Sequence, residues 1–171
     1  MMTALIERQL TQAERQGSER LDFLRDILRA SRAGFLKFCL FLPFANHRAS
    51  LPADAYYVAR LVAVMNEDCG PCVQTVIDFA EKAGVAPEIV QAVVERRPES
   101  LPRELADVYR FAEGIAANDG SAVHLSETLR ARYGNSGMVD LAFGIATGRV
   151  FPTIKRVLGY GQSCSITPFR I

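Results

Sequence analysis

Two cysteines in the stretch EDCGPCV, residues 67–73, are the residues best suited to chemistry in this sequence. Cys69 and Cys72 stand three positions apart, so on a helix they share one face and can close locally to a disulfide. Such a pair is a reversible two-electron couple. Pro71 suits the first turn of a helix and Asp68 is placed to be its N-cap, which predicts that the pair opens a helix.

The neighbouring residues give opposite indications about the reactivity of these thiols. The N-terminus of a helix carries partial positive charge, which favours a thiolate, above all at Cys69. Glu67 and Asp68 place negative charge beside the same residue, which disfavours a thiolate. Val73 and Val76 continue the cysteine face as an apolar one. A second interpretation is therefore a packed, unreactive pair of small side chains.

Few other side chains are suited to assist the pair. Tyr57 can orient a thiolate, although a phenol is a poor base at neutral pH. Arg60, one turn later, can supply positive charge. His47 and His124 are the only histidines, and either can serve as a proton carrier from another helix or subunit.

The remaining cysteines and the sequence context suggest neither a metal site nor a disulfide scaffold. One C-x-x-C supplies two of the four ligands of a structural zinc site, and no second pair completes it. Cys39 lies in an apolar run and is predicted to be in the core, whereas Cys164 is predicted to be exposed. The N-terminus lacks a signal-peptide pattern, so we expect a cytoplasmic, reducing location in which any disulfide is redox-active and not structural. No bound cofactor or metal is expected.

Composition excludes several classes of partner. The chain has 171 residues, 49% of them hydrophobic, which fits one globular domain. Twenty basic residues stand against nineteen acidic ones without a cationic stripe, so neither nucleic acid nor a membrane surface is expected as a partner. The longest apolar run, residues 35–44, contains a lysine and a proline and is too short to span a membrane. Its phenylalanines, Phe35, Phe38, Phe41 and Phe44, are predicted to lie in the core or at a subunit interface.

Apolar residues recur with helical period in successive segments, and no alternating pattern typical of a strand is present. The stripes are Leu21, Leu24, Ile27 and Leu28; Val58, Leu61, Val62 and Met65; Val73, Val76, Ile77 and Ala80; Ile89, Val90, Val93 and Val94; Leu105, Val108, Tyr109 and Ala112; and Met138, Leu141, Ala142 and Ile145, continued by Ile154, Val157 and Leu158. Gly84, Gly134 and Gly159 follow such runs, as glycines that end helices do. We predict an all-α bundle of about seven helices in a single domain, 1–171. Residues 1–50 form an N-terminal helical extension that packs on the core or on a neighbouring subunit.

An amphipathic helix followed by C-x-x-C at the start of a second helix resembles the carboxymuconolactone decarboxylase-like family, specifically its alkylhydroperoxidase-D-like branch. The matching core, residues 51–161, includes "YYVARLVAVMNEDCGPCVQTVIDFAEKAGV" and "MVDLAFGIATGRVFPTIKRVLGYG". The resemblance implies an all-α fold that assembles into homo-oligomers. For two-cysteine members it also implies peroxidase or disulfide reductase activity. Nothing in the chain identifies a lactone site for the reaction in the family's name.

In those members a glutamate twelve positions before the first cysteine and a histidine four positions after the second relay a proton away from the thiol. Here the two positions hold Tyr57 and Val76, so the cysteine pair matches while the relay is replaced. By the family analogy Cys72 attacks the peroxide, whereas the argument from the helix N-terminus favours Cys69. Both assignments stay open on the sequence alone.

We therefore expect a thiol-dependent redox protein that uses Cys69 and Cys72, a peroxide or disulfide substrate and an external thiol reductant. One alternative is a catalytically silent, oligomeric binding or scaffold protein of the same fold. Another is a thioredoxin-like oxidoreductase with a helical insertion, because CGPC is the thioredoxin tetrapeptide. Against the latter, the chain has no tryptophan and shows no strand pattern outside this region.

Overall fold

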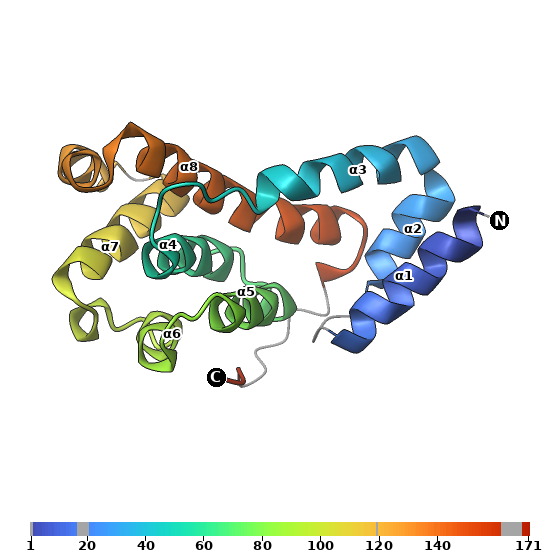
Figure 1. Cartoon of the computed structure of the whole chain (residues 1–171), viewed down its shortest axis with the longest axis horizontal. Coiled ribbons are helices and arrows are strands. Elements are labelled where there is room, and N and C mark those ends of the chain that lie inside the picture. Colours follow the sequence, from blue (N-terminus) through green and yellow to red (C-terminus); the bar gives the residue numbers. More distant parts are fainter. Residues whose placement is uncertain (1, 17–20, 119, 162–168) are drawn as a thin grey trace.

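The computed structural model describes residues 2–16, 21–118, 120–161 and 169–171. Over these residues the chain forms α-helices and short 3-10 helices without a β-strand (Figure 1). The all-α prediction is therefore confirmed, and the thioredoxin-like alternative, which requires a sheet, is wrong. Within the same residues no helix combines the length and the apolarity needed to cross a membrane. Cys164 lies outside the described residues.

The helices follow one another with short connections. They are α1 (Met2–Gln16), α2 (Asp22–Ala30), α3 (Arg32–Ala45), α4 (Ala53–Met65), α5 (Gly70–Lys82), α6 (Pro87–Val94), α7 (Arg103–Ala117) and α8 (Ser126–Val157), with 3-10 turns at Pro98–Ser100 and Val123–Leu125. Gly84 and Gly159 adopt positive φ after α5 and α8, as predicted for glycines that end helices. Gly134 has φ 69° and a non-helical ψ, so α8 consists of two helical segments that meet at this residue.

Helix α4 is the centre of the core, surrounded by α5, α6, α7 and α8 (Figure 1). It is apolar on nearly all sides, and its residues from Val58 to Val64 are buried without exception. Helix α8 approaches it closely at Gly148, where a Cβ atom would stand 3.1 Å from both the Cβ of Ala63 and the carbonyl oxygen of Arg60. The absence of a side chain at Gly148 therefore lets these two helices touch.

The N-terminal helices pack on the C-terminal half of α8, with α3 alongside it and α2 at its end (Figure 1). Phe23 of α2 is buried, and its ring meets the edges of Phe38 and Tyr160 at centroid distances of 6.2 Å and 6.4 Å. Phe35 lies in the core, whereas Phe44 is 40% exposed. The N-terminal extension therefore packs on α8 of the same chain.

The last apolar stripe predicted from the sequence is confirmed at Leu141 and Ile145, which are buried, but its continuation to Val157 and Leu158 is wrong. Val157 is 81% and Leu158 is 42% exposed, whereas Pro152 and Lys155 are buried. The end of α8 therefore turns a different face inward from the one that apolar periodicity indicates. The long methylene stem of Lys155 makes this possible, because a lysine can bury its stem against apolar neighbours.

Asp140 of α8 holds the connection between α3 and α4. Its fully buried carboxylate accepts the backbone N–H groups of Ala49, Ser50 and Leu51 at 2.8–3.2 Å. Burial raises the pKa of this carboxyl, but the three N–H bonds outweigh that effect and hold the pKa below its ordinary value. The carboxylate thereby fixes how the chain enters α4, the helix that carries Arg60.

Candidate redox site

Cys69 and Cys72 form a disulfide at the start of α5, with their Cα atoms 5.3 Å apart. Cys69 is the N-cap residue, with non-helical φ and ψ, and Cys72 lies in the first turn. Both residues are buried, at 2% and 5% exposure. The prediction that Asp68 caps the helix is wrong, because Asp68 has φ 50°, is exposed, and α5 has no side-chain cap bond. Because α5 begins at Gly70, the cap position falls on Cys69.

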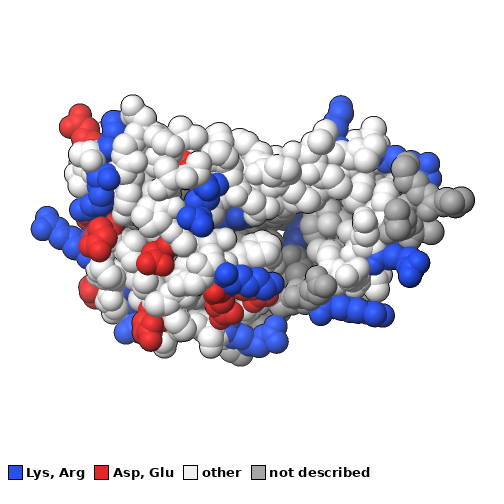
Figure 2. Space-filling model, in the orientation of Figure 1, with Lys and Arg blue, Asp and Glu red and all other residues white. Residues whose placement is uncertain are grey.

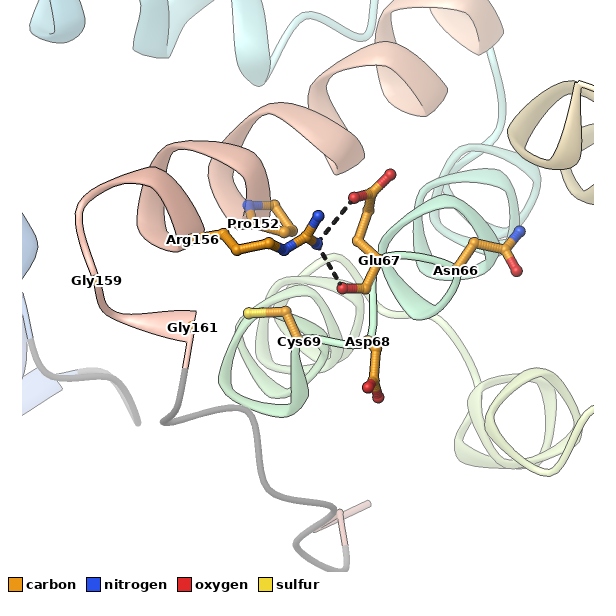
Figure 3. Close-up of a pocket in the computed structure, with 8 residues that line it drawn as sticks. All are labelled: Asn66, Glu67, Asp68, Cys69, Pro152, Arg156, Gly159 and Gly161. Carbon is orange, nitrogen blue, oxygen red and sulfur yellow. Dashed lines mark hydrogen bonds and ion pairs between the residues drawn. The ribbon is translucent and has the colours of Figure 1, made fainter.

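Two arginines of α8 hold the loop before the cysteines. Arg149 Nε donates to the Glu67 carboxylate at 2.8 Å. Arg156 Nη2 donates to the Glu67 carbonyl oxygen at 2.9 Å and to its carboxylate at 3.1 Å, as Figure 3 shows. Burial raises the pKa of Glu67, but both arginines lower it by more, and the net pKa is below its ordinary value. The negative charge that the sequence places beside Cys69 is therefore balanced by two guanidinium groups.

Cys69 faces an open, polar cleft of about 670 Å³ between this loop and the end of α8. Figure 3 shows its sulfur directed toward the side of the cleft on which Arg156 and Gly161 lie. Asn66, Glu67 and Asp68 form the opposite wall. Cys69 therefore borders an open cleft, although the residue is only 2% exposed.

Cys72 faces a different space, a cavity of about 170 Å³ with mainly apolar walls. Lys155 lines this cavity and places its Nζ 3.5 Å from the Cys72 sulfur and 5.1 Å from the centroid of the Phe23 ring. Sequence reasoning missed Lys155, because it lies between residues assigned to an apolar stripe. Its burial at 5% exposure depends on tertiary contacts, including those with Cys72 of α5 and Phe23 of α2.

Arg60, predicted to supply positive charge, reaches the same cavity and not the cleft at Cys69. It is 3% exposed. Its Nη1 donates to the Tyr56 hydroxyl and to Asn46 Oδ1, each at 3.4 Å, while its buried Nε has no hydrogen-bond partner. Two cations, Arg60 and Lys155, thus border the space beside Cys72.

The other predicted supporting residues lie elsewhere. The Tyr57 ring packs perpendicular to that of Tyr56 at 5.2 Å and lines neither of these two cavities. His124 is exposed in the 3-10 turn before α8, and His47 lies 3.4 Å from Asp140. Neither histidine takes the place of the absent relay within the chain. Val76, at the relay's histidine position, is a buried wall of the cavity at Cys72.

Cys39, predicted to be a core residue, is half-buried and unpaired, and burial raises the pKa of its thiol. In the described part of the chain, no group of three or more histidine, cysteine, aspartate or glutamate side chains is arranged to hold a metal ion. Comparisons of this chain with protein-family models, with curated proteins and with solved structures gave no match.

Proposed function

We propose that this protein is a thiol-dependent oxidoreductase in which the Cys69–Cys72 couple reduces a peroxide and Cys72 is the attacking residue. The proposal depends above all on the 3.5 Å contact between Lys155 Nζ and the Cys72 sulfur in a buried setting. An ammonium at this distance stabilises the thiolate, which is the nucleophilic form of cysteine. Lys155 would thereby do the work that a glutamate and a histidine do in the alkylhydroperoxidase-D-like branch, which the sequence resembles.

In the oxidative half of the reaction, the Cys72 thiolate attacks the outer oxygen of ROOH and the O–O bond breaks. The products are a Cys72 sulfenic acid and RO⁻, and the alkoxide takes a proton from the Lys155 ammonium to leave as ROH. The Cys69 thiol then attacks the sulfenic sulfur. This step forms the disulfide and releases water.

The reductive half begins from the disulfide. The thiolate of an external thiol enters the open cleft and attacks Cys69, which releases Cys72 as a thiolate beside the Lys155 ammonium. A second external thiol then resolves the mixed disulfide at Cys69. Two thiols become one disulfide for each peroxide reduced, which requires a reducing compartment such as the cytoplasm.

The test uses the full-length protein, reduced with dithiothreitol, desalted and mixed with one equivalent of cumene hydroperoxide. We expect consumption of the peroxide and formation of the Cys69–Cys72 disulfide, both measured by mass spectrometry. The Cys69→Ser variant should stop at a Cys72 sulfenic acid that dimedone traps, and Cys72→Ser should leave the peroxide unconsumed. Cys39→Ser is the matched control and should behave as wild type.

Two outcomes would contradict this assignment. A sulfenic acid trapped at Cys69 in Cys72→Ser would exchange the roles of the two cysteines. Peroxide consumption no faster than that of the unfolded chain would mean that the pair is packed and unreactive. The protein would then be the catalytically silent relative that the sequence allows.

A disulfide reductase function is the second candidate, favoured by the large open cleft at Cys69. In that reaction the Cys69 thiolate attacks a substrate disulfide, and Cys72 displaces the reduced substrate. Reduced protein mixed with glutathione disulfide distinguishes the two functions. A disulfide reductase would oxidise faster with glutathione disulfide than with an equal concentration of cumene hydroperoxide.

A further inference from the structure

The cavity beside Cys72 combines buried positive charge with apolar walls. Arg60 and Lys155 border it at 3% and 5% exposure, and the described residues that line it include no aspartate or glutamate. Its other walls include the rings of Phe23, Phe38 and Phe151. Burying a cation such as Arg60 among apolar side chains is costly unless a counter-charge accompanies it. The surroundings of Arg60 in this cavity therefore favour an anionic occupant.

The guanidinium of Arg60 shows where the anion would bind. Both of its hydrogen bonds to described residues start at Nη1 and are long, at 3.4 Å. Its Nε is buried without a partner, and no described carboxylate lies within ion-pair distance of the group. A carboxylate takes two parallel hydrogen bonds from a guanidinium. The Arg60 guanidinium lines the cavity with only long hydrogen bonds to described residues, and is therefore suited to a carboxylate from outside the chain.

The size of the cavity limits the rest of the ligand. Its volume is about 170 Å³. A dry protein cavity of about 150 Å³ is large enough for benzene, so the apolar body has the size of one ring or a short alkyl chain. The cavity lies where α2 and α3 meet α4, α5 and α8. Figure 2 shows the surface hollowed between the N-terminal helices and the rest of the molecule, with basic side chains in its depth.

From these three features we infer that the cavity binds a small organic acid, with its carboxylate on Arg60 and its apolar body against the phenylalanine rings. The site goes beyond the peroxidase proposal, because binding needs neither turnover nor a reduced cysteine pair. A ligand seated there lies against Cys72, so it would compete with any peroxide that enters the cavity.

Isothermal titration calorimetry on the oxidised, full-length protein tests the site with benzoate, benzyl alcohol and hexadecanoate. We expect benzoate to bind at least about tenfold more tightly than benzyl alcohol, since a hydrogen bond to a charged group is worth about that factor. Hexadecanoate should bind more weakly than benzoate, because its chain exceeds the cavity. Tighter binding of hexadecanoate would instead indicate a lipid-like ligand and overturn the inference of a small acid.

Variants and a direct spectroscopic signal locate the binding. Arg60→Gln should weaken benzoate binding about tenfold or more, whereas Arg130→Gln, on the exposed start of α8, should leave it unchanged. In wild type, NMR signals of the arginine Nε–Hε groups report the site even if a variant fails to fold. Benzoate should shift the Arg60 signal. Equal affinity for benzoate and benzyl alcohol, or a shift confined to other arginines, would overturn the inference, as would absence of binding at millimolar benzoate.

Discussion

Replacing Lys155 with methionine removes one positive charge beside Cys72 while it keeps an apolar stem of similar length. At the observed 3.5 Å between Nζ and the sulfur, the attraction between an ammonium and a thiolate is about 5 kcal/mol for an effective dielectric constant of about 20. Since about 1.4 kcal/mol corresponds to one pKa unit, the ammonium can lower the thiol pKa by up to about three and a half units. Burial of the thiolate opposes part of this effect. We therefore expect Lys155→Met to raise the pH midpoint of Cys72 alkylation by at least about one unit.

The assay follows iodoacetamide labelling of the reduced protein across pH, with mass spectrometry to separate the four thiols. In wild type, Cys72 should label with a midpoint below about 8.5, the ordinary value for a cysteine. Lys82→Met is the matched control, because Lys82 is exposed in the last turn of the same helix as Cys72. Equal Cys72 midpoints in wild type and Lys155→Met would refute the assignment of Lys155 as the group that stabilises the thiolate.

Three further predictions concern the packing that supports the site. Asp140→Ala leaves three backbone N–H groups without their acceptor and should lower the free energy of unfolding in urea by about 3 kcal/mol or more. Because the native pKa of Asp140 lies below its ordinary value, its contribution to stability is present above about pH 3.9 and is lost as pH falls through the native pKa. The urea midpoint of unfolding should therefore fall less steeply with decreasing pH in Asp140→Ala than in wild type. Equal pH dependence in the two proteins would contradict this reasoning. Gly148→Ala should lower the free energy of unfolding by about 1–3 kcal/mol, because its Cβ would meet the backbone of α4. A stabilisation by about 0.5–1 kcal/mol, the usual gain for glycine to alanine in a helix, would show that α4 and α8 can move apart.

Most of the fold could be predicted from the sequence, because helix formation and burial leave local patterns. Apolar residues at helical spacing mark α4, α5 and α7, and glycines with positive φ mark the ends of α5 and α8. Periodicity failed at the end of α8, where Val157 is exposed and Lys155 is buried. At this end of α8, the side chains that become buried are those that contact the N-terminal helices α2 and α3.

The candidate site likewise has a part that the sequence predicts and a part that depends on packing. That Cys69 and Cys72 can form a disulfide at the start of a helix follows from their spacing, since a separation of three residues makes that contact local. The surroundings of each sulfur, in contrast, depend on how distant helices pack. Lys155 reaches Cys72 from 83 residues away, and Glu67 is paired with arginines from the same distant helix. Charge and burial at a sulfur depend on the side chains that packing brings within a few ångströms, and no spacing along the chain encodes those distances.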